Sequence, residues 1–379
     1  MRVLQVSNGW TEGGSALYAE ALACELASLA SIERFGPGDV HGRRAHGFQG
    51  TLRDPAAEAS FRARLGGVDL VHVHHLAGLS LSLPLVAAGA GVPVVITLHD
   101  YWLACARGQL INLDRERCTG PEPDRCAACL APDLWVPVPI ALATRLPRRR
   151  AAVDDRAELW REIRDKVSLF LAPSRHVAAR LQVKATLLPL PLLRMVLPAP
   201  AGPAGILRLL FLGSWLPTKG PQVLLDAFSR LPAGSAALTL AGPSPAWRGS
   251  MAWSEALKRR ALATPGVTVL GNVVGAAVSE VLSGHDVLVL PSTWEENAPL
   301  VLGEALAAGL RVLASDVGGV PEIAPEARLV EAGDVAALAA ALADEVRRGR
   351  GRRNPVERPS MATHALAMLE LYESVLAAR

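Results

Sequence analysis

The chain has 379 residues, of which half are apolar and a fifth are charged; this indicates a globular protein of two-domain size and excludes a disordered chain. A net charge of +3 is too small to indicate a nucleic-acid partner. The opening residues MRVLQVSNGW do not have the pattern of a secretory signal, so we expect a cytoplasmic protein.

Short apolar runs separated by helical segments recur along the chain, as is typical of parallel strands buried on both faces. They are residues 2–7, 69–74, 93–99 and 169–174, then 207–214, 236–242, 267–272, 287–292 and 311–316. Residues 187–205 are rich in proline and glycine, which predicts a linker. We therefore expect an α/β chain with doubly wound, Rossmann-like domains over residues 1–190 and 205–360 that face across a cleft.

Two features bear on membranes. Residues 76–98 carry no charge, but Pro84 and Pro93 divide them, so we expect a buried helix and then a buried strand instead of a membrane span. The arginine-rich runs 145–150 and 347–353 are interpreted as solvated loops. The alternative for 145–150 is contact with anionic lipid headgroups, which would make membrane contact at most peripheral, at the inner membrane face.

The segment EENAPLVLGEALAAG (295–309) places two carboxylates around an apolar helix. Pro299 suits the first helical position and Gly309 the residue past the last turn. Glu296 then precedes the helix, and Glu304 lies in its second turn. A diphosphate could bind the unpaired first amides, with Glu296 on a sugar and Glu304 on a ribose; alternatively, Glu296 caps the helix and Glu304 pairs with an arginine. The residues at that helix start are Ala298, Pro299, Leu300 and Val301.

Three segments together resemble the retaining glycosyltransferases of family 4, which have the GT-B fold. They are GGSALYAEALACEL (13–26), FLGSWLPTKG (211–220) and LVLPSTWEENAPLVLGEALAAGLRVLASDVGGVPE (288–322), and the resemblance covers essentially the whole chain. It implies that Glu296 contacts the donor sugar, Glu304 the ribose and Lys219 the diphosphate. Other residues that we expect around the donor follow predicted strands: Gly13, Gly14, Gly213, Ser214 and Asn272. The last helix, 361–379, is expected to pack back on the first domain.

One position departs from that family. The family carries an arginine directly after the glycine of the first strand of its second domain, where this chain has Ser214. Two cations would normally neutralise the leaving diphosphate. Arg175, which follows the predicted strand 169–174, is a candidate substitute, and a surface residue at a helix start is the alternative.

His99 ends the predicted strand 93–99, and the resemblance places such a histidine near the reacting sugar. A histidine could orient the sugar or transfer a proton near neutral pH. The alternatives are a buried structural histidine or a partner for Asp100. Alternation turns His72 and His74 to one face, and at least one of them is interpreted as structural.

Four of the five cysteines lie between residues 99 and 130: Cys105, Cys118, Cys126 and Cys129. The last two have the spacing of a zinc knuckle, so a structural zinc is one hypothesis, and unrelated thiols or a redox pair are the others.

The resemblance implies a retaining transfer from a nucleoside diphosphate sugar to a hydroxyl of a small-molecule, lipid or glycan acceptor, by front-face substitution that requires no catalytic metal. His99, Lys219 and Glu296 are its predicted catalytic residues. Two alternatives remain open: a same-fold epimerase or hydrolase of nucleotide sugars, and a non-catalytic subunit that binds a nucleotide sugar for a partner enzyme.

Overall fold

The structure, a computed structural model, describes residues 1–10, 13–40, 52–112, 114–129, 145–194, 196, 205–247 and 250–378, with the backbone alone for 145–149. The chain divides into two compact units. The first consists of Met1–Pro189 and Ser360–Arg379, and the second of Leu190–Pro359. The chain therefore passes from one unit to the other twice.

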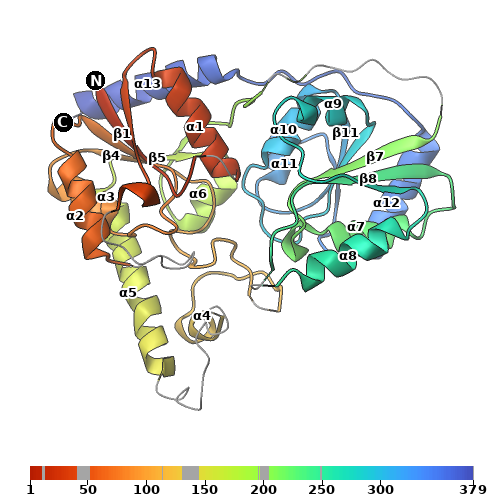
Figure 1. Ribbon diagram of the computed structural model, residues 1–379, viewed down its shortest axis with the longest axis horizontal. Helices are drawn as coiled ribbons and strands as arrows, with labels where there is room; N and C mark the ends of the chain where they lie inside the picture. Colours follow the sequence, from red (N-terminus) through yellow and green to blue (C-terminus); the bar gives the residue numbers. More distant parts are fainter. Residues whose placement is uncertain are drawn as a thin grey trace. The chain divides into compact units, whose positions relative to one another are not determined.

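The first unit is built on a parallel sheet whose strands follow the order β2-β1-β3-β4-β5-β6 (Figure 1). These strands are β1 (Arg2–Val6), β2 (Ser31–Phe35), β3 (Leu70–Val73), β4 (Val94–Thr97), β5 (Leu169–Ala172) and β6 (Thr186–Leu187). Its helices are α1 (Gly14–Leu26), α2 (Pro55–Arg64), α3 (Leu83–Gly89), α4 (Pro123–Cys129), α5 (Arg145–Lys166), α6 (Arg175–Leu181) and α13 (Met361–Ala377).

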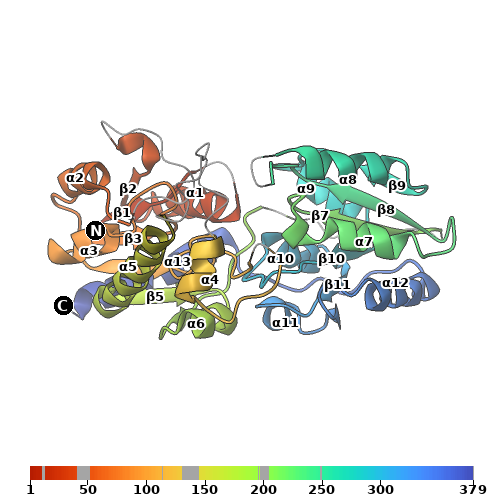
Figure 2. The same cartoon turned by 90° about the horizontal axis from the view of Figure 1, so that it is seen from below.

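The second unit has a parallel sheet of the order β12-β11-β10-β7-β8-β9 (Figure 2). Its strands are β7 (Leu207–Leu212), β8 (Ala236–Ala241), β9 (Val267–Val269), β10 (Val287–Leu290), β11 (Arg311–Ser315) and β12 (Arg328–Val330). Its helices are α7 (Pro221–Phe228), α8 (Ala252–Leu262), α9 (Ala277–Ser283), α10 (Leu300–Ala307), α11 (Val320–Ile323) and α12 (Val335–Arg348).

Helices cover both faces of the second sheet, and successive side chains of each strand point to opposite faces. Leu209 and Phe211 of β7 join a core with residues of α7, α8 and α12, whereas Leu210 and Leu212 join another core with residues of α9, α10 and α11. Helices α7 and α12 contact each other on the first of these faces. The two covered faces explain why these strands are continuous apolar runs in the sequence.

Helix α13 completes the first unit, where it contacts α1 (Figure 1). Its His364 is hydrogen-bonded to the hydroxyl of Tyr18 on α1 at 2.7 Å. Its Tyr372 hydroxyl lies 2.6 Å from Nδ1 of His72 on β3. The last helix is therefore fastened to both a helix and a strand of this unit by buried polar contacts.

The expected fold class, two doubly wound α/β domains with parallel sheets, is confirmed. Three strands were not predicted: β2, β6 and β12. β2 is an edge strand with the sequence SIERF, and β6 has two exposed residues. Edge strands of this kind lack the apolar run on which the prediction rests.

The uncharged stretch 76–98 contains α3 and then the buried strand β4, which confirms the predicted helix and strand. Within the described ranges, no helix is long and apolar enough to cross a membrane.

The prediction of solvated loops for the two arginine runs is partly wrong: Arg150, Arg347 and Arg348 are exposed, but they lie on helices. Residues 145–150 begin helix α5. In the second run, Arg352 donates hydrogen bonds to the carbonyl oxygens of Ala308, Ser283 and His285 at 2.8, 2.6 and 2.7 Å. These carbonyls lie at or just beyond the carboxyl ends of α10 and α9, where helices leave carbonyls without intrahelical partners. Arg352 therefore caps two helices at once.

Candidate functional site

In the second unit, the loops that follow β7 and β10 approach each other closely. Gly220 has a positive φ of 74°, and a Cβ atom there would lie 1.9 Å from the carbonyl oxygen of Pro291. The amide of Thr293 also donates to the carbonyl of Thr218 at 2.8 Å. A glycine at 220 is thus required for the approach that places Lys219 beside the residues after β10.

The predicted pair Lys219 and Glu296 is in direct contact. Lys219 Nζ lies 2.7 and 2.9 Å from the two carboxylate oxygens of Glu296, which is 2% exposed. Ser292 Oγ donates to Glu296 Oε1 at 2.6 Å, and Lys219 Nζ also lies 4.8 Å from the ring centroid of Trp294. A buried carboxylate needs such compensation, because an unpaired charge at this depth would be costly.

The backbone of Glu296 is also held by neighbouring residues. The amide of Gly319 donates to the carbonyl oxygen of Glu296 at 2.7 Å. Gly318 has a φ of +57°, and a Cβ atom there would lie 1.8 Å from that same oxygen. The loop after β11 therefore packs directly against Glu296, which fixes the chain just before α10.

Helix α10 begins at Leu300, and Pro299 is its N-cap with φ −64° and ψ 122°. The predicted start at Pro299 was therefore one residue early, because the extended ψ of Pro299 places it outside the helix. Residues 298–301, which were expected to face a phosphate, are half-buried. The first amides of a helix have no intrahelical acceptors, so they are available to an anion.

Glu304 is 4% exposed in α10 and forms an ion pair with Arg194, whose Nε lies 2.8 Å from Oε1. Oε1 nevertheless has no well-directed hydrogen bond. Burial raises the pKa of the Glu304 carboxyl above its usual range, and the positive charge of Arg194 opposes that rise. The structure thus contains the alternative arrangement, in which Glu304 pairs with an arginine.

The remaining predicted donor residues of this unit lie after strands, as expected. The amide of Gly213 donates to the carbonyl of Ala241 at 3.0 Å, and its own carbonyl lies so close to Gly242 that a Cβ there would approach to 2.1 Å. Ser214 is half-buried next to the fully buried Trp215. Asn272 is exposed beyond β9.

In the first unit, His99 lies beyond β4 in a buried aromatic cluster. Its Nε2 is 3.4 Å from Nδ1 of His74, and its ring centroid is 5.0 Å from that of Tyr18. Burial lowers the pKa of His99 well below its usual range, and the neighbouring His74 adds to this effect. His99 is therefore neutral at physiological pH. His72 is also buried, with Nδ1 on Tyr372 and Nε2 2.8 Å from Thr97 Oγ1, as a structural histidine would be.

The partner of Asp100 is His75. The amide of Ala77 donates to His75 Nδ1 at 3.0 Å, so Nε2 carries the proton that faces Asp100 Oδ2 at 3.0 Å. Asp100 Oδ1 accepts from the amide of Trp102 at 2.8 Å. His75 therefore fixes the carboxylate that follows His99, and the alternative of a His99–Asp100 pair was wrong about the partner.

The other predicted residues of the first unit lie at helix starts. Gly13 has a φ of +86° and caps α1, whose first residue is Gly14. A positive φ favours glycine at this turn. Arg175 is exposed at the first position of α6, after the N-cap Ser174.

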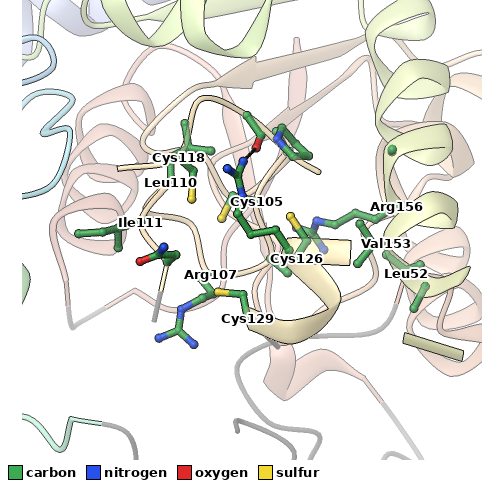
Figure 3. A pocket seen from close by; sticks show the side chains of 18 residues that line it. Leu52, Cys105, Arg107, Leu110, Ile111, Cys118, Cys126, Cys129, Val153 and Arg156 are labelled. Carbon is green, nitrogen blue, oxygen red and sulfur yellow. Dashed lines mark hydrogen bonds between the residues drawn. The ribbon is translucent and has the colours of Figure 1, made fainter. Parts of the chain in front are cut away.

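The four clustered cysteines line one cavity of about 140 Å³ (Figure 3). They are Cys105, Cys118, Cys126 and Cys129, and all four are free thiols. Burial raises the pKa of three of these thiols, to about 11 for Cys129. In the part of the chain that the structure describes, no group of three or more His, Cys, Asp or Glu is placed to hold a metal ion. The cysteines thus share a cavity, and a structural zinc there stays a hypothesis beside unrelated thiols and a redox pair.

Two residues outside the predicted set contact its glutamates, Ser292 on Glu296 and Arg194 on Glu304, and Trp294 lies against Lys219. Ser292 and Trp294 lie in the segment that follows β10, so the rule that ligands bind beyond the carboxyl ends of strands could have included them. Arg194 lies in the proline-rich stretch that was interpreted as a linker, and nothing in its local sequence indicates its contact with Glu304.

Residues 207–347 match the model of the family described as Glycosyl transferases group 1. A curated relative, D-inositol 3-phosphate glycosyltransferase of Mycobacterium ulcerans, is 30% identical over 158 residues, which are 41% of this chain and 34% of the relative. The chain thus matches about a third of the length of that protein.

Among solved structures, sucrose-phosphate synthase from Thermosynechococcus elongatus has a TM-score of 0.66 and 19% identity, with 100% of both chains covered. Anabaena HepE in complex with UDP and glucose has a TM-score of 0.60 and 16% identity, with 100% of this chain and 98% of the other covered. These similarities show the two-domain GT-B fold over the whole chain. The family match, over residues 207–347, indicates a domain similar to those of the glycosyl transferases group 1 in the second unit.

Proposed function

We propose that the protein is a retaining glycosyltransferase of family 4 that moves a sugar from a nucleoside diphosphate sugar to an acceptor hydroxyl. In this proposal the second unit binds the donor and the first unit binds the acceptor. The solved structure of HepE contains UDP and glucose, so UDP-glucose is the first donor to test. The acceptor class, which includes small molecules, lipids and glycans, is left to experiment.

The observation that carries the proposal is the arrangement around the start of α10. A buried carboxylate with a lysine partner, Glu296, precedes the helix, and a second buried carboxylate, Glu304, lies in its second turn. Between them are the free amides and the positive end of the helix dipole. A diphosphate on those amides would have polar groups at both ends for the hydroxyls of a sugar and of a ribose.

The bond changes are those of a front-face substitution. The acceptor oxygen forms a bond to the anomeric carbon on the face from which the diphosphate leaves, and the acceptor proton passes to a diphosphate oxygen. Lys219 and the first amides of α10 stabilise the negative charge that develops on the leaving group. Lys219 must then share its charge between Glu296, which it contacts at 2.7 Å, and the diphosphate. In this scheme no step is assigned to a metal ion.

His99 would orient the reacting sugar in this scheme. Its lowered pKa keeps it a neutral imidazole at neutral pH, which can donate one hydrogen bond and accept another but cannot act as a general acid. Because the acceptor proton passes to the diphosphate in this scheme, no base is needed, and we assign His99 to orientation of the sugar.

The test begins with binding of UDP, GDP and ADP by calorimetry and continues with transfer from the matching nucleotide glucose to a panel of acceptors. Glu304→Gln should weaken binding of the nucleoside diphosphate by about tenfold, because a buried carboxylate that accepts two hydroxyls is lost. Lys219→Met should chiefly lower turnover. The anomeric configuration of the product, read by NMR, tests retention, and activity in EDTA tests independence of a metal.

Three results would contradict the proposal in different ways. Release of nucleotide at the same rate with and without an acceptor would indicate a hydrolase or epimerase. Tight donor binding without turnover on any acceptor would indicate a binding subunit. Unchanged kinetics in both the Glu304 and Lys219 variants would place the donor elsewhere.

A further inference from the structure

The partner of Glu304 comes from the segment that precedes the second sheet. Arg194 lies thirteen residues before the first residue of β7, and its Nε is 2.8 Å from Glu304 Oε1. Its NH1 group also lies 3.4 Å from the carbonyl oxygen of Gly275, just before α9. The guanidinium is thus held between two parts of the second unit, and its side chain is 22% exposed, whereas that of Glu304 is 5% exposed.

A buried carboxylate in this position has two requirements if it is to bind a ribose. It must stay ionised, because a carboxylate accepts hydrogen bonds from both hydroxyls whereas a protonated acid accepts less well. It must also present its oxygens in a fixed direction. Burial acts against the first requirement, and Arg194 is the charged side chain that acts on Glu304 among the residues described.

Arg194 makes its short contact with one oxygen of the carboxylate. Its Nε lies 2.8 Å from Oε1, which is closed to solvent. A ribose hydroxyl would therefore have to bind at Oε2, while the ion pair supplies the charge and fixes the direction of the carboxylate.

We propose that Arg194 is a positioning residue for nucleotide binding, which keeps the Glu304 carboxylate ionised and directed at the ribose hydroxyls of the donor. This inference rests on the proposed function, since it assigns the ribose to Glu304. Arg194 touches the ligand's partner and not the reacting atoms, so its effect should appear in affinity and not in the chemical step.

The experiment compares UDP with 2′,3′-dideoxy-UDP in calorimetric titrations of the full chain. Arg194→Met should weaken UDP binding by about tenfold and leave dideoxy-UDP binding within about twofold, because the dideoxy compound has no hydroxyls for Glu304. Arg194→Lys, which keeps the charge, should restore part of the loss.

The pH dependence supplies a second readout. Without Arg194 the pKa of Glu304 rises further, so UDP affinity of Arg194→Met should fall at a higher pH than that of the wild type as the pH is lowered from 8 to 6. The affinity for dideoxy-UDP should not change in parallel. A merely structural role of Arg194 would weaken both ligands equally at every pH.

Arg328→Met is the matched control. Arg328 also belongs to the second unit and pairs with a carboxylate, Asp344, on α12. This variant should bind both ligands as the wild type does, and circular dichroism of all variants checks that they fold.

The outcomes distinguish a failure of the role of Arg194 from a failure of the proposed function. Equal losses for UDP and dideoxy-UDP, or an unchanged UDP affinity in Arg194→Met, would overturn the role of Arg194 while leaving the donor site in place. A wild-type protein that binds none of UDP, GDP and ADP would instead overturn the proposed function, and the role of Arg194 with it.

Discussion

Lys219 and Glu296 form a buried charged pair at the place where we propose that the donor binds. Both oxygens of Glu296 are occupied, by Lys219 Nζ and in part by Ser292, in a place that is almost closed to solvent. Under the proposal, a sugar or a diphosphate would compete with these contacts. The pair would also be held in place before the donor arrives, which would reduce the reorganisation that binding requires.

A double-mutant cycle tests whether Lys219 and Glu296 together stabilise the fold. Lys219→Met leaves the Glu296 carboxylate buried without its cation, so the free energy of unfolding should fall by roughly 3 kcal/mol. The double variant Lys219→Met/Glu296→Gln removes the charge as well and should recover most of that loss. Urea unfolding of the wild type, both single variants and the double variant supplies the values. Additive losses would show that the two side chains do not stabilise each other.

At the level of single residues, the sequence was sufficient to place Lys219 near Glu296 and to offer an arginine as one partner of Glu304, but not to identify which arginine. The first contact follows from loops after neighbouring strands β7 and β10. The second depends on Arg194, whose approach is set by the path of an irregular segment, and irregular backbone has no periodicity from which a contact can be predicted.

At the level of secondary-structure elements, the loop after β11 packs against the residues just before α10. Gly318 can approach the backbone of Glu296 because it lacks a side chain and adopts a positive φ. The same segment then starts the short helix α11. A loop in which no site residue was predicted thus holds Glu296, which is a predicted site residue, in position.

Two glycine substitutions in neighbouring elements should have opposite effects on stability. Gly318→Ala would force a Cβ atom into the carbonyl of Glu296 and should lower the free energy of unfolding by at least about 2 kcal/mol. Gly303→Ala, in the middle of α10 with no atom within 4 Å of a new Cβ, should raise it by up to about 1 kcal/mol. Thermal and urea unfolding of both variants checks this. Similar unfolding midpoints for the two variants would mean that the loop after β11 shifts to accept the new Cβ atom without loss of stability.

The strands with two covered faces were predictable because burial on both sides requires apolar residues throughout. The edge strands β2, β6 and β12 were not, since partial exposure permits charged residues such as those of SIERF. The prediction of a solvated loop for residues 347–353 failed for a related reason. Composition alone does not distinguish an arginine in solvent from one such as Arg352, which donates to helix-terminal carbonyls.

For the whole molecule, the buried histidines of the first unit predict a stability that depends on pH. Burial lowers the pKa of His72 to about 3 and that of His364 to about 4. In the unfolded chain both titrate near 6.5, so between pH 6.5 and 4 the unfolded state binds protons that the folded state does not. Stability is therefore complete above pH 6.5 and is lost as the pH falls.

The expected loss is about 2 kcal/mol for each of these two histidines between pH 8 and pH 5. Urea unfolding at pH 8, 6.5 and 5 measures it, and His364→Asn should show a weaker dependence because one such group is gone. The carboxyl groups whose pKa values are lowered titrate below this window; they are Glu33, Asp100 and Asp286. A free energy of unfolding that is the same at pH 8 and 5 would contradict the assignment of neutral buried histidines.

The return of the chain to the first unit at Ser360 has a consequence for how the protein is made. While the ribosome is still translating the second unit, the hydroxyl of Tyr18 and Nδ1 of His72 lack the partners that they have in the finished fold, because His364 and Tyr372 have not yet been synthesised. The second unit, whose residues 190–359 are continuous, can complete its folding first even though it emerges later. A chain truncated after residue 359 and released from the ribosome should therefore contain a finished second unit and a first unit that still exposes the apolar surface of α1.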